Sequence, residues 1–418
     1  MTQGTYGEES AGRGLLAALA RMFSSFADLR FRRYAIGAQF AYTGSWMIQL
    51  SQSLLILELS GGSGALLGIT LAIQSLPLLL FGPWTGVLAD RIGPRRVLMA
   101  GELMMMTVAT TQAVFIALGL ASITSVLVLA ALFGLGSLME QTMRSAVVVD
   151  LVSTGRIANA VSLNALFLQL GRFVGPAVGG VLVASTGFVL PFAVGAALFG
   201  GFALVLATLG GSRHAAVASV SRGLGPALAF IRRDPVLPEV LVIAAVGGLV
   251  GPNFVTFATL ILTEDFDAGP EQVGLAATAL AVGTIAGALV AAWRNSTSVV
   301  LVRWGAVGVG VLTILALASP NITVYMVTLV AAGFAAMMLV TQSGSTVQAR
   351  ATTELRGRVS AVFSVFLLVG IPVGAPVFGV LADSLDPRLA SAVLGATVLV
   401  CVLIAWLTLG RARRSSRE

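Results

Sequence analysis

The stretch GVLADRIGPRR, residues 86–96, lies between two long apolar runs and decides the fold. Gly93 and Pro94 are residue types that make a tight turn, and Asp90 places a carboxylate where it can face a helix N-terminus or an arginine. Arginines beside an apolar run keep a loop in the cytoplasm, and the stretch contains Arg91, Arg95 and Arg96. The stretch is therefore predicted to be a short cytoplasmic loop between two membrane-spanning helices.

The composition is typical of a membrane protein. The 418 residues are 57% hydrophobic and 10% charged, whereas soluble domains contain about 25% charged residues. The net charge is +7, but all 25 basic residues are arginines and they cluster in the loops of one side. We therefore attribute the charge to orientation in the lipid bilayer and exclude nucleic acid as a partner.

The sequence also excludes several kinds of chemistry. Cys401 is the only cysteine and His214 the only histidine, so no intrachain disulfide, thiol metal site or histidine-based catalytic set can form. Without lysine there is no phosphate-binding loop of the type G-x-x-x-x-G-K-[ST]. We expect no metal, no cofactor and no enzymatic activity, and energy from an ion gradient or from the substrate gradient.

Twelve apolar segments are each long enough for a spanning helix, which needs about 20 residues. They are 34–59, 65–89, 96–118, 121–148, 158–185, 188–210, 236–262, 271–293, 298–318, 321–347, 358–382 and 389–410. The predicted fold class is an all-α membrane protein with twelve transmembrane helices.

The longest polar stretch divides the segments into two sets of six. We expect a cytoplasmic tail with an amphipathic surface helix at 1–33, an N-terminal half at 34–210, a cytoplasmic linker at 211–235, a C-terminal half at 236–410 and a cytoplasmic tail at 411–418. These boundaries are expectations from the placement of apolar and polar residues.

Arginine placement sets the orientation in the membrane. Apart from Arg172, deep in a segment, and Arg388, in an alternate loop, the arginines lie in the tails, in the inner loops or at adjoining helix ends. The outer loops instead carry acids, at 264–271 and 383–386. Both termini are therefore predicted to be cytoplasmic.

An internal repeat supports the division into halves. Residues 156–183 align with residues 355–382, and the string GVLAD of residues 86–90 recurs at 379–383. In the longer alignment Gly171, Gly175 and Gly180 meet Gly370, Gly374 and Gly379. Two parallel six-helix halves around a central cavity explain such a repeat.

The loop at 86–96 resembles the loop 2–3 motif of the major facilitator superfamily, G-x-x-x-D-R-x-G-R-R. The matching residues are Gly86, Asp90, Arg91, Gly93 and Arg95, and Pro94 departs from the pattern. Residues 142–164 are similar to the drug:proton antiporter branch that includes macrolide-efflux and enterobactin-export proteins. The resemblance implies two pseudo-symmetric halves that alternate in access, a conformational latch at the five matching residues, and a monomer.

Segment 158–185 contains GRFVGPAVGG, residues 171–180, which resembles the antiporter motif of exporters in this superfamily. Small residues at this spacing allow close helix packing, and proline permits a bend. We expect helix hinges at Gly171, Gly175, Pro176, Gly179, Gly180, Pro372, Gly374 and Pro376. A tightly packed, kinked helix without any bearing on transport direction is the alternative.

Three charged residues lie deep in predicted segments. Arg172 is roughly 15 Å from either surface by helix rise, and Glu140 precedes Arg144 by one helical turn. An acid that alternates between an arginine and a proton could couple transport to a proton gradient, so Glu140, Arg144 and Arg172 are the proton-coupling candidates. Static ion pairs are the alternative, and for Glu102 we favour a structural role.

Polar and aromatic residues in the segments predict the wall of the substrate cavity. They are Tyr42, Trp46, Gln49, Gln74, Asn164, Gln169, Arg172 and Asn253. An aromatic, amide-lined cavity with few charges suits amphipathic small molecules.

The predicted function is a secondary transporter in the plasma (inner) membrane of a bacterium, which exports antibiotics or siderophores in exchange for protons by rocking its halves. A lysophospholipid flippase or an importer of the same fold is one alternative. A non-transporting membrane receptor or assembly factor is another.

Overall fold

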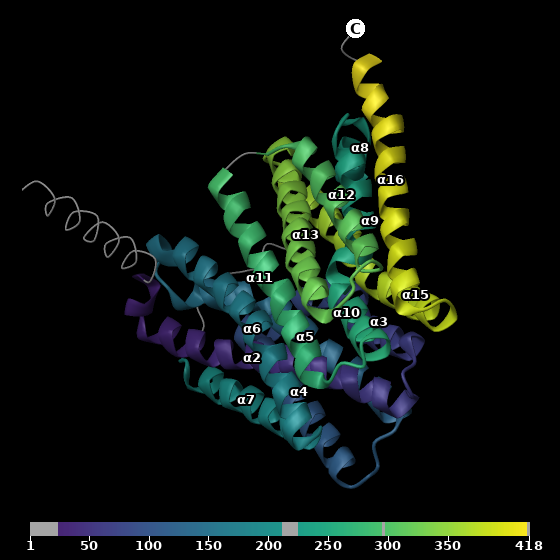
Figure 1. Cartoon of the computed structure of the whole chain (residues 1–418). Helices are drawn as coiled ribbons and strands as arrows, with labels where there is room; N and C mark the ends of the chain where they lie inside the picture. The colour runs from purple at the N-terminus through teal and green to yellow at the C-terminus, as the bar shows by residue number, and fades with distance from the viewer. Residues whose placement is uncertain (1–23, 211–224, 295–296, 416–418) are drawn as a thin grey trace, which may run out of the picture.

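The computed structural model describes residues 24–210, 225–294 and 297–415, and within these ranges the chain is built from helices without strands (Figure 1). The first helices are α2 (Leu29–Ser60), α3 (Gly64–Ile92), α4 (Pro94–Ala117), α5 (Ile123–Leu151), α6 (Ile157–Thr186) and α7 (Val189–Thr208). They are followed by α8 (Gly225–Arg233), α9 (Leu237–Val250), α10 (Phe254–Leu260), α11 (Pro270–Arg294), α12 (Val299–Leu315), α13 (Ile322–Arg350), α14 (Arg356–Leu368), α15 (Gly370–Ser384) and α16 (Pro387–Ser415).

The predicted fold class is confirmed, because each of the twelve predicted segments coincides with one helix or with one interrupted helix. Ten helical segments of the described residues are long and apolar enough to cross a membrane. The helix α12 is apolar but has only 17 residues. The helix α2 has 32 residues and is less apolar, because glutamines, serines and aromatic residues occupy much of it.

Two spanning segments are interrupted. After α9, a 3-10 turn at Gly251–Asn253, the helix α10 and a π-helical turn at Ile261–Asp265 complete the seventh segment. In the eleventh segment α14 ends at Leu368. Pro372 explains that end, because its ring clashes with the carbonyl four residues earlier and it has no N–H to donate. Pro176, by contrast, lies inside a continuous α6.

The tails and the linker differ in part from the predicted ranges. Helix α2 begins at Leu29, and its N-cap Asp28 accepts the backbone N–H of Arg30 at 2.9 Å. The first residues of α2 and a 3-10 turn at Ser24–Ala27 therefore occupy part of the predicted tail 1–33, and residues 1–23 lie outside the described residues. Residues 211–224 of the linker and 416–418 of the tail also lie outside them.

The main contacts between the two sets of helices join α3 to α15 and α6 to α11. Figure 1 shows α3 and α15 side by side. Gly64 and Gly68 of α3 lie so close to the α15 backbone that an added Cβ would collide with Gly379 and Ala375. On the other side Thr278 of α11 donates to the carbonyl of Phe173 at 3.0 Å. Small residues thus bring four backbones together at the end of the bundle that carries the acidic loops.

The opposite end of α3 is not packed in the same way. Ideal Cβ atoms on Gly82 and Gly86 of α3, and on Gly357 of α14, would have no neighbouring atom within 4 Å. The halves therefore touch where α3 begins and α15 ends. At the end of α3 and the start of α14, these three glycines have no close neighbour from the other half.

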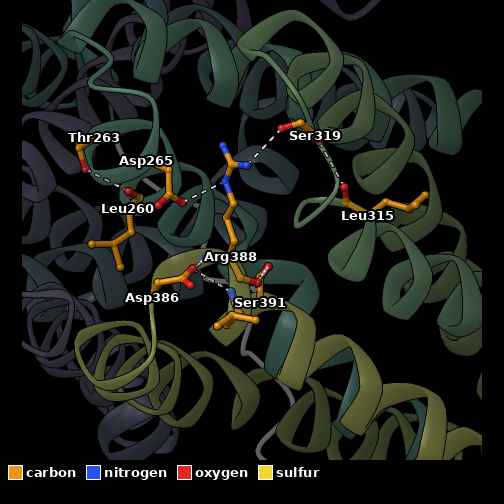
Figure 2. A network of polar contacts seen from close by, with 9 residues as sticks. Leu260, Thr263, Asp265, Leu315, Ser319, Asp386, Arg388 and Ser391 are labelled. Atoms are coloured by element: carbon orange, nitrogen blue, oxygen red, sulfur yellow. Dashed lines mark hydrogen bonds and ion pairs between the residues drawn. The ribbon is translucent and has the colours of Figure 1, made fainter.

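One arginine fixes the acidic end of the C-terminal helices (Figure 2). Arg388 Nε lies 3.3 Å from Asp265 Oδ2, and its Nη1 donates to the carbonyl of Ser319 at 3.3 Å. The guanidinium also lies 4.4 Å from the ring centroid of Phe266. These contacts explain why an arginine lies among the acidic loops, because Arg388 ties the start of α16 to the end of the seventh segment.

Candidate transport site

A buried ion pair on α5 lies against α2. Arg144 Nη2 is 2.6 Å from Glu140 Oε1, and their side chains are 11% and 6% exposed. The guanidinium carbon of Arg144 lies 4.7 Å from the ring centroid of Tyr42, and Tyr42 donates to Asn164 Oδ1 on α6 at 2.9 Å. The ion pair that the spacing of Glu140 and Arg144 predicts is thus present. The ring of Tyr42, and its hydrogen bond to Asn164, connect the pair to α6.

The other deep arginine has a different environment. Arg172 of α6 lies with its guanidinium carbon 4.7 Å from the ring centroid of Trp46 on α2. The ion pairs of the described residues include none to Arg172, and Glu140 is paired with Arg144 instead. Of the two arginines among the coupling candidates, only Arg144 forms an ion pair with Glu140 in this conformation.

Glutamines connect α2 and α3. Gln49 donates to Gln74 Oε1 at 3.2 Å, and Gln74 donates to Gln52 Oε1 at 3.2 Å. Gln52 was not among the predicted cavity residues, although it lies three residues after Gln49. Gln169 is partly exposed on α6 and has no hydrogen bond within the described residues. The two cavity candidates Gln49 and Gln74 are therefore brought together, with Gln52 as a third member.

Asn253 lies apart from these residues and has a packing contact. It is 2% exposed and donates to the carbonyl of Leu249 at 2.8 Å and of Gly370 at 3.4 Å. An added Cβ on Gly374 would collide with Leu249. The amide thus bridges the interruptions of the seventh and eleventh segments, at the place where the predicted hinge residues of α15 begin.

The glycine motif of α6 brings this helix against two others. Cβ atoms on Gly171 and Gly175 would overlap the α2 backbone, and one on Gly180 would collide with the carbonyl of Pro270 on α11. A Cβ on Gly179 would lie 3.1–3.3 Å from atoms of Met47, which is a tight contact. The predicted close packing is therefore present, with the N-terminal part of the motif on α2 and the last glycine on the other half. The hinge role of these residues stays a prediction.

A fourth charged residue inside a helical segment is Glu102, for which the sequence favoured a structural role. Glu102 on α4 is 0% exposed, and neither carboxylate oxygen has a hydrogen-bond partner within the described residues. The neighbouring Gly101 approaches the backbone of Gly136 and Glu140 on α5. A buried carboxyl without a partner favours its neutral form, because the charge would be costly to desolvate. Its depth could have been read from the sequence, but its lack of a partner could not.

The loop at 86–96 divides into two parts. Gly93 has φ 90° and makes the turn between α3 and α4. Arg95 donates to the carbonyls of Ala207 and Gly210 at 2.8 Å each, and to those of Leu206 and Leu209. Basic side chains stabilise a helix C-terminus in this way. Arg95 thus anchors the end of α7 in this conformation. The side chains of Asp90 and Arg91 are exposed on the surface of the protein.

Comparisons with known proteins agree with this architecture. A family model described as transmembrane secretion effector matches residues 20–415. The multidrug efflux pump Tap of Mycolicibacterium fortuitum is 26% identical over 342 residues, which cover 77% of this chain and 82% of the pump. A staphyloferrin A transporter of Staphylococcus aureus is 26% identical over 150 residues, or 34% of this chain and 36% of that protein.

Solved structures with the same fold are also transporters. A bacterial homologue of the human lysosomal transporter Spinster, in an inward-facing and occupied conformation, matches with TM-score 0.73 and 16% identity, covering 93% of this chain and 97% of that one. A bacterial homologue of the iron transporter ferroportin, in an inward-facing state, matches with TM-score 0.71 and 15% identity, covering 91% and 98%. At these identities the likeness concerns the fold alone.

Proposed function

The chain belongs to the transmembrane secretion effector family of major facilitator transporters, and we propose that it exports small amphipathic compounds, such as antibiotics or siderophores, in exchange for protons. It works as a monomer in the plasma membrane of a bacterium, with both termini in the cytoplasm. The similarity to a multidrug efflux pump supports an export role, and the similarity to a staphyloferrin A transporter supports a small organic substrate. The arginine-rich loops support the orientation.

The ion pair of Glu140 and Arg144 is the observation that carries the proposal. It is nearly fully buried, and breaking it exposes an unpaired charge to a low-dielectric interior. A proton on Glu140 removes the carboxylate charge and releases Arg144. Arg144 contacts the ring of Tyr42, and Tyr42 is hydrogen-bonded to Asn164 of α6. Proton binding therefore changes the contacts among α2, α5 and α6.

The position of the contacts between the halves supports alternating access. The halves touch through α3, α15, α6 and α11 at the acidic end, which the proposed orientation places outside the cell. The conformation is then open toward the cytoplasm, where an exporter takes up its substrate. In the opposite conformation Asp90 and Gly86 of α3 would close the inner end against α14, as the family motif implies.

Proteoliposomes with an imposed pH gradient test the function. Macrolides, tetracyclines, cationic dyes and catecholate siderophores are added one class at a time while an internal dye reports pH. A proton flux evoked by one class supports antiport and names that class. Protein-containing liposomes whose flux equals that of empty liposomes with every class would contradict proton-coupled export of these compounds.

A lipid carrier is the second candidate, because one observation favours it. A groove of about 730 Å³ lies among α11, α12 and α13, and its lining is almost entirely apolar, with Trp304, Phe334 and Met338 beside small residues. Such a groove on spanning helices suits an acyl chain. Fluorescent lysophospholipid in the same liposomes, quenched from outside, distinguishes the candidates, because a flippase would make the lipid of the inner leaflet accessible without a drug.

A further inference from the structure

The position of Arg172 is fixed by the packing of its own helix. Gly171, one residue before it, and Gly175, three residues after it, both approach α2 so closely that a side chain at either position would overlap the backbone around Tyr42 and Thr43. The α6 backbone cannot move away from α2 here without losing this contact. The guanidinium group therefore has a defined place beside Trp46, 4.7 Å from its ring centroid to the guanidinium carbon.

The charge of Arg172 is not balanced by a neighbouring acid. Within the described residues no carboxylate oxygen lies within 4.0 Å of it, and no hydrogen bond joins it to another side chain. Arg144, in the same half, is paired with Glu140. The face of an indole ring attracts a guanidinium cation but offers no lone pair to its N–H groups. Arg172 thus offers several donors at a place where charges are normally paired.

We propose that Arg172 and Trp46 form an anion-binding subsite that takes the carboxylate of an amphipathic organic substrate. The inference rests on the proposed function and names the substrate class. The planar guanidinium fork matches a carboxylate with two parallel N–H···O bonds. Trp46 holds the guanidinium plane on one side and offers apolar surface to an aromatic or aliphatic substrate body. Gln49, three residues along α2, adds an amide that is already bonded to Gln74.

The same arrangement disfavours a cationic substrate at this position. The face of Trp46 that would attract a cation is occupied by Arg172. A second positive charge beside an unpaired guanidinium is repelled, and the repulsion is strong where water is scarce. Glu140, the buried acid of α5, is paired with Arg144. The subsite therefore selects organic anions over cations of the same shape.

Equilibrium binding with a matched pair of probes tests the subsite. The purified full-length protein in lipid nanodiscs, without any gradient, is titrated with 2-naphthoate and with 2-naphthylmethylammonium, which share a ring system and differ in the sign of charge. We expect naphthoate to bind at least about tenfold more tightly than the ammonium probe, and Arg172→Gln to remove that preference. Arg172→Lys keeps the charge without the planar fork, so it should weaken naphthoate binding and retain only part of the preference.

Controls separate the subsite from folding and from coupling. Arg294→Gln removes an exposed arginine at the end of α11 and should leave the selectivity unchanged. Naphthoate binding that is unaltered in Arg172→Gln, absent from the wild-type protein, or matched by the ammonium probe overturns the proposal. If Arg172→Gln fails to fold, Arg172→Lys and Trp46→Leu decide, since both should weaken naphthoate more than the ammonium probe. Glu140→Gln, which tests the proposed coupling, should still prefer naphthoate, so the two proposals fail separately.

Discussion

The carboxylate of Asp383, near the end of α15, accepts the backbone N–H of Gly64 at the start of α3, at 2.6 Å. It also accepts the hydroxyl of Ser63 and the N–H of Ala65, both at 3.0 Å. An acid at a helix N-terminus satisfies the free N–H groups and interacts favourably with the helix dipole. Because α3 and α15 belong to different halves, this one carboxylate helps to hold the acidic end closed.

Asp383→Asn should open that end. An amide accepts more weakly than a carboxylate, so we expect a loss of about 1–3 kcal/mol from the closed arrangement. Spin labels at Thr186→Cys and Glu271→Cys, in a Cys401→Ser background, report the distance between α6 and α11 at the same end. The distance distribution should gain a longer component in Asp383→Asn. A distribution identical to that of the parent would show that Asp383 does not hold the halves together.

The repeated string GVLAD has two different environments. In its second copy, a Cβ on Gly379 would collide with the carbonyl of Gly64, and Asp383 caps α3. In its first copy, Gly86 has no neighbour within 4 Å of a Cβ and Asp90 is exposed. The two copies lie at opposite ends of the packed helices α3 and α15. We interpret the first copy, at the end of α3, as the one that packs against the other half when that end of the bundle closes.

Valine at Gly379 and valine at Gly86 should therefore have different effects. Gly379→Val places side-chain atoms into the α3 backbone, so it should destabilise the protein by several kcal/mol, as overpacking does at about 1–3 kcal/mol or more. Gly86→Val meets open space and should leave the melting temperature near that of the wild type, but it should block closure of the other end and abolish transport. Melting temperatures in detergent and uptake by proteoliposomes measure the two effects. Full transport by Gly86→Val would contradict the proposed counterpart.

Glu140 and Glu102, the buried acids of α5 and α4, should respond differently to replacement by glutamine. Glu140→Gln leaves Arg144 without its ion-pair partner, which costs about 3–5 kcal/mol when the pair is buried. Glu102→Gln removes no hydrogen bond or ion pair of the described residues and should leave stability unchanged or increased. Thermal melting of both variants checks the contrast, and Glu140→Gln combined with Arg144→Gln should recover part of the loss. Equal destabilisation by both single changes would mean that Glu102 has a partner in solution.

The helices could be read from the sequence because hydrophobic length decides them. Predicted segment 96–118 corresponds to α4 at Pro94–Ala117, and predicted segment 321–347 to α13 at Ile322–Arg350. The interruption of the seventh segment at Gly251–Asn253 was not predicted, since its apolar run is continuous. Pro252 in that turn has no N–H to donate, so the break has a local signal that hydrophobic length does not count. The bond from Asn253 to the carbonyl of Gly370 joins distant segments and leaves no periodic trace in the sequence.

The site was predicted in part for the same reason. The spacing of Glu140 and Arg144 on one helix is local, and the pair forms. The partner of Arg172 depended on how α6 faces α2, and the structure places Trp46 there rather than an acid. Asp383 gave no sign of its contact with Gly64 beyond the repeated string, because more than 300 residues separate them.

The central claim, that Glu140 couples transport to protons, is tested most directly by comparing two modes of transport in one variant. Glu140→Gln, which leaves Arg172 and Trp46 intact, is reconstituted beside the wild type with the substrate class identified in the flux assay. The account predicts that the variant loses accumulation driven by a pH gradient and retains exchange of labelled for unlabelled substrate without a gradient. Gradient-driven accumulation by Glu140→Gln at the wild-type rate would contradict it.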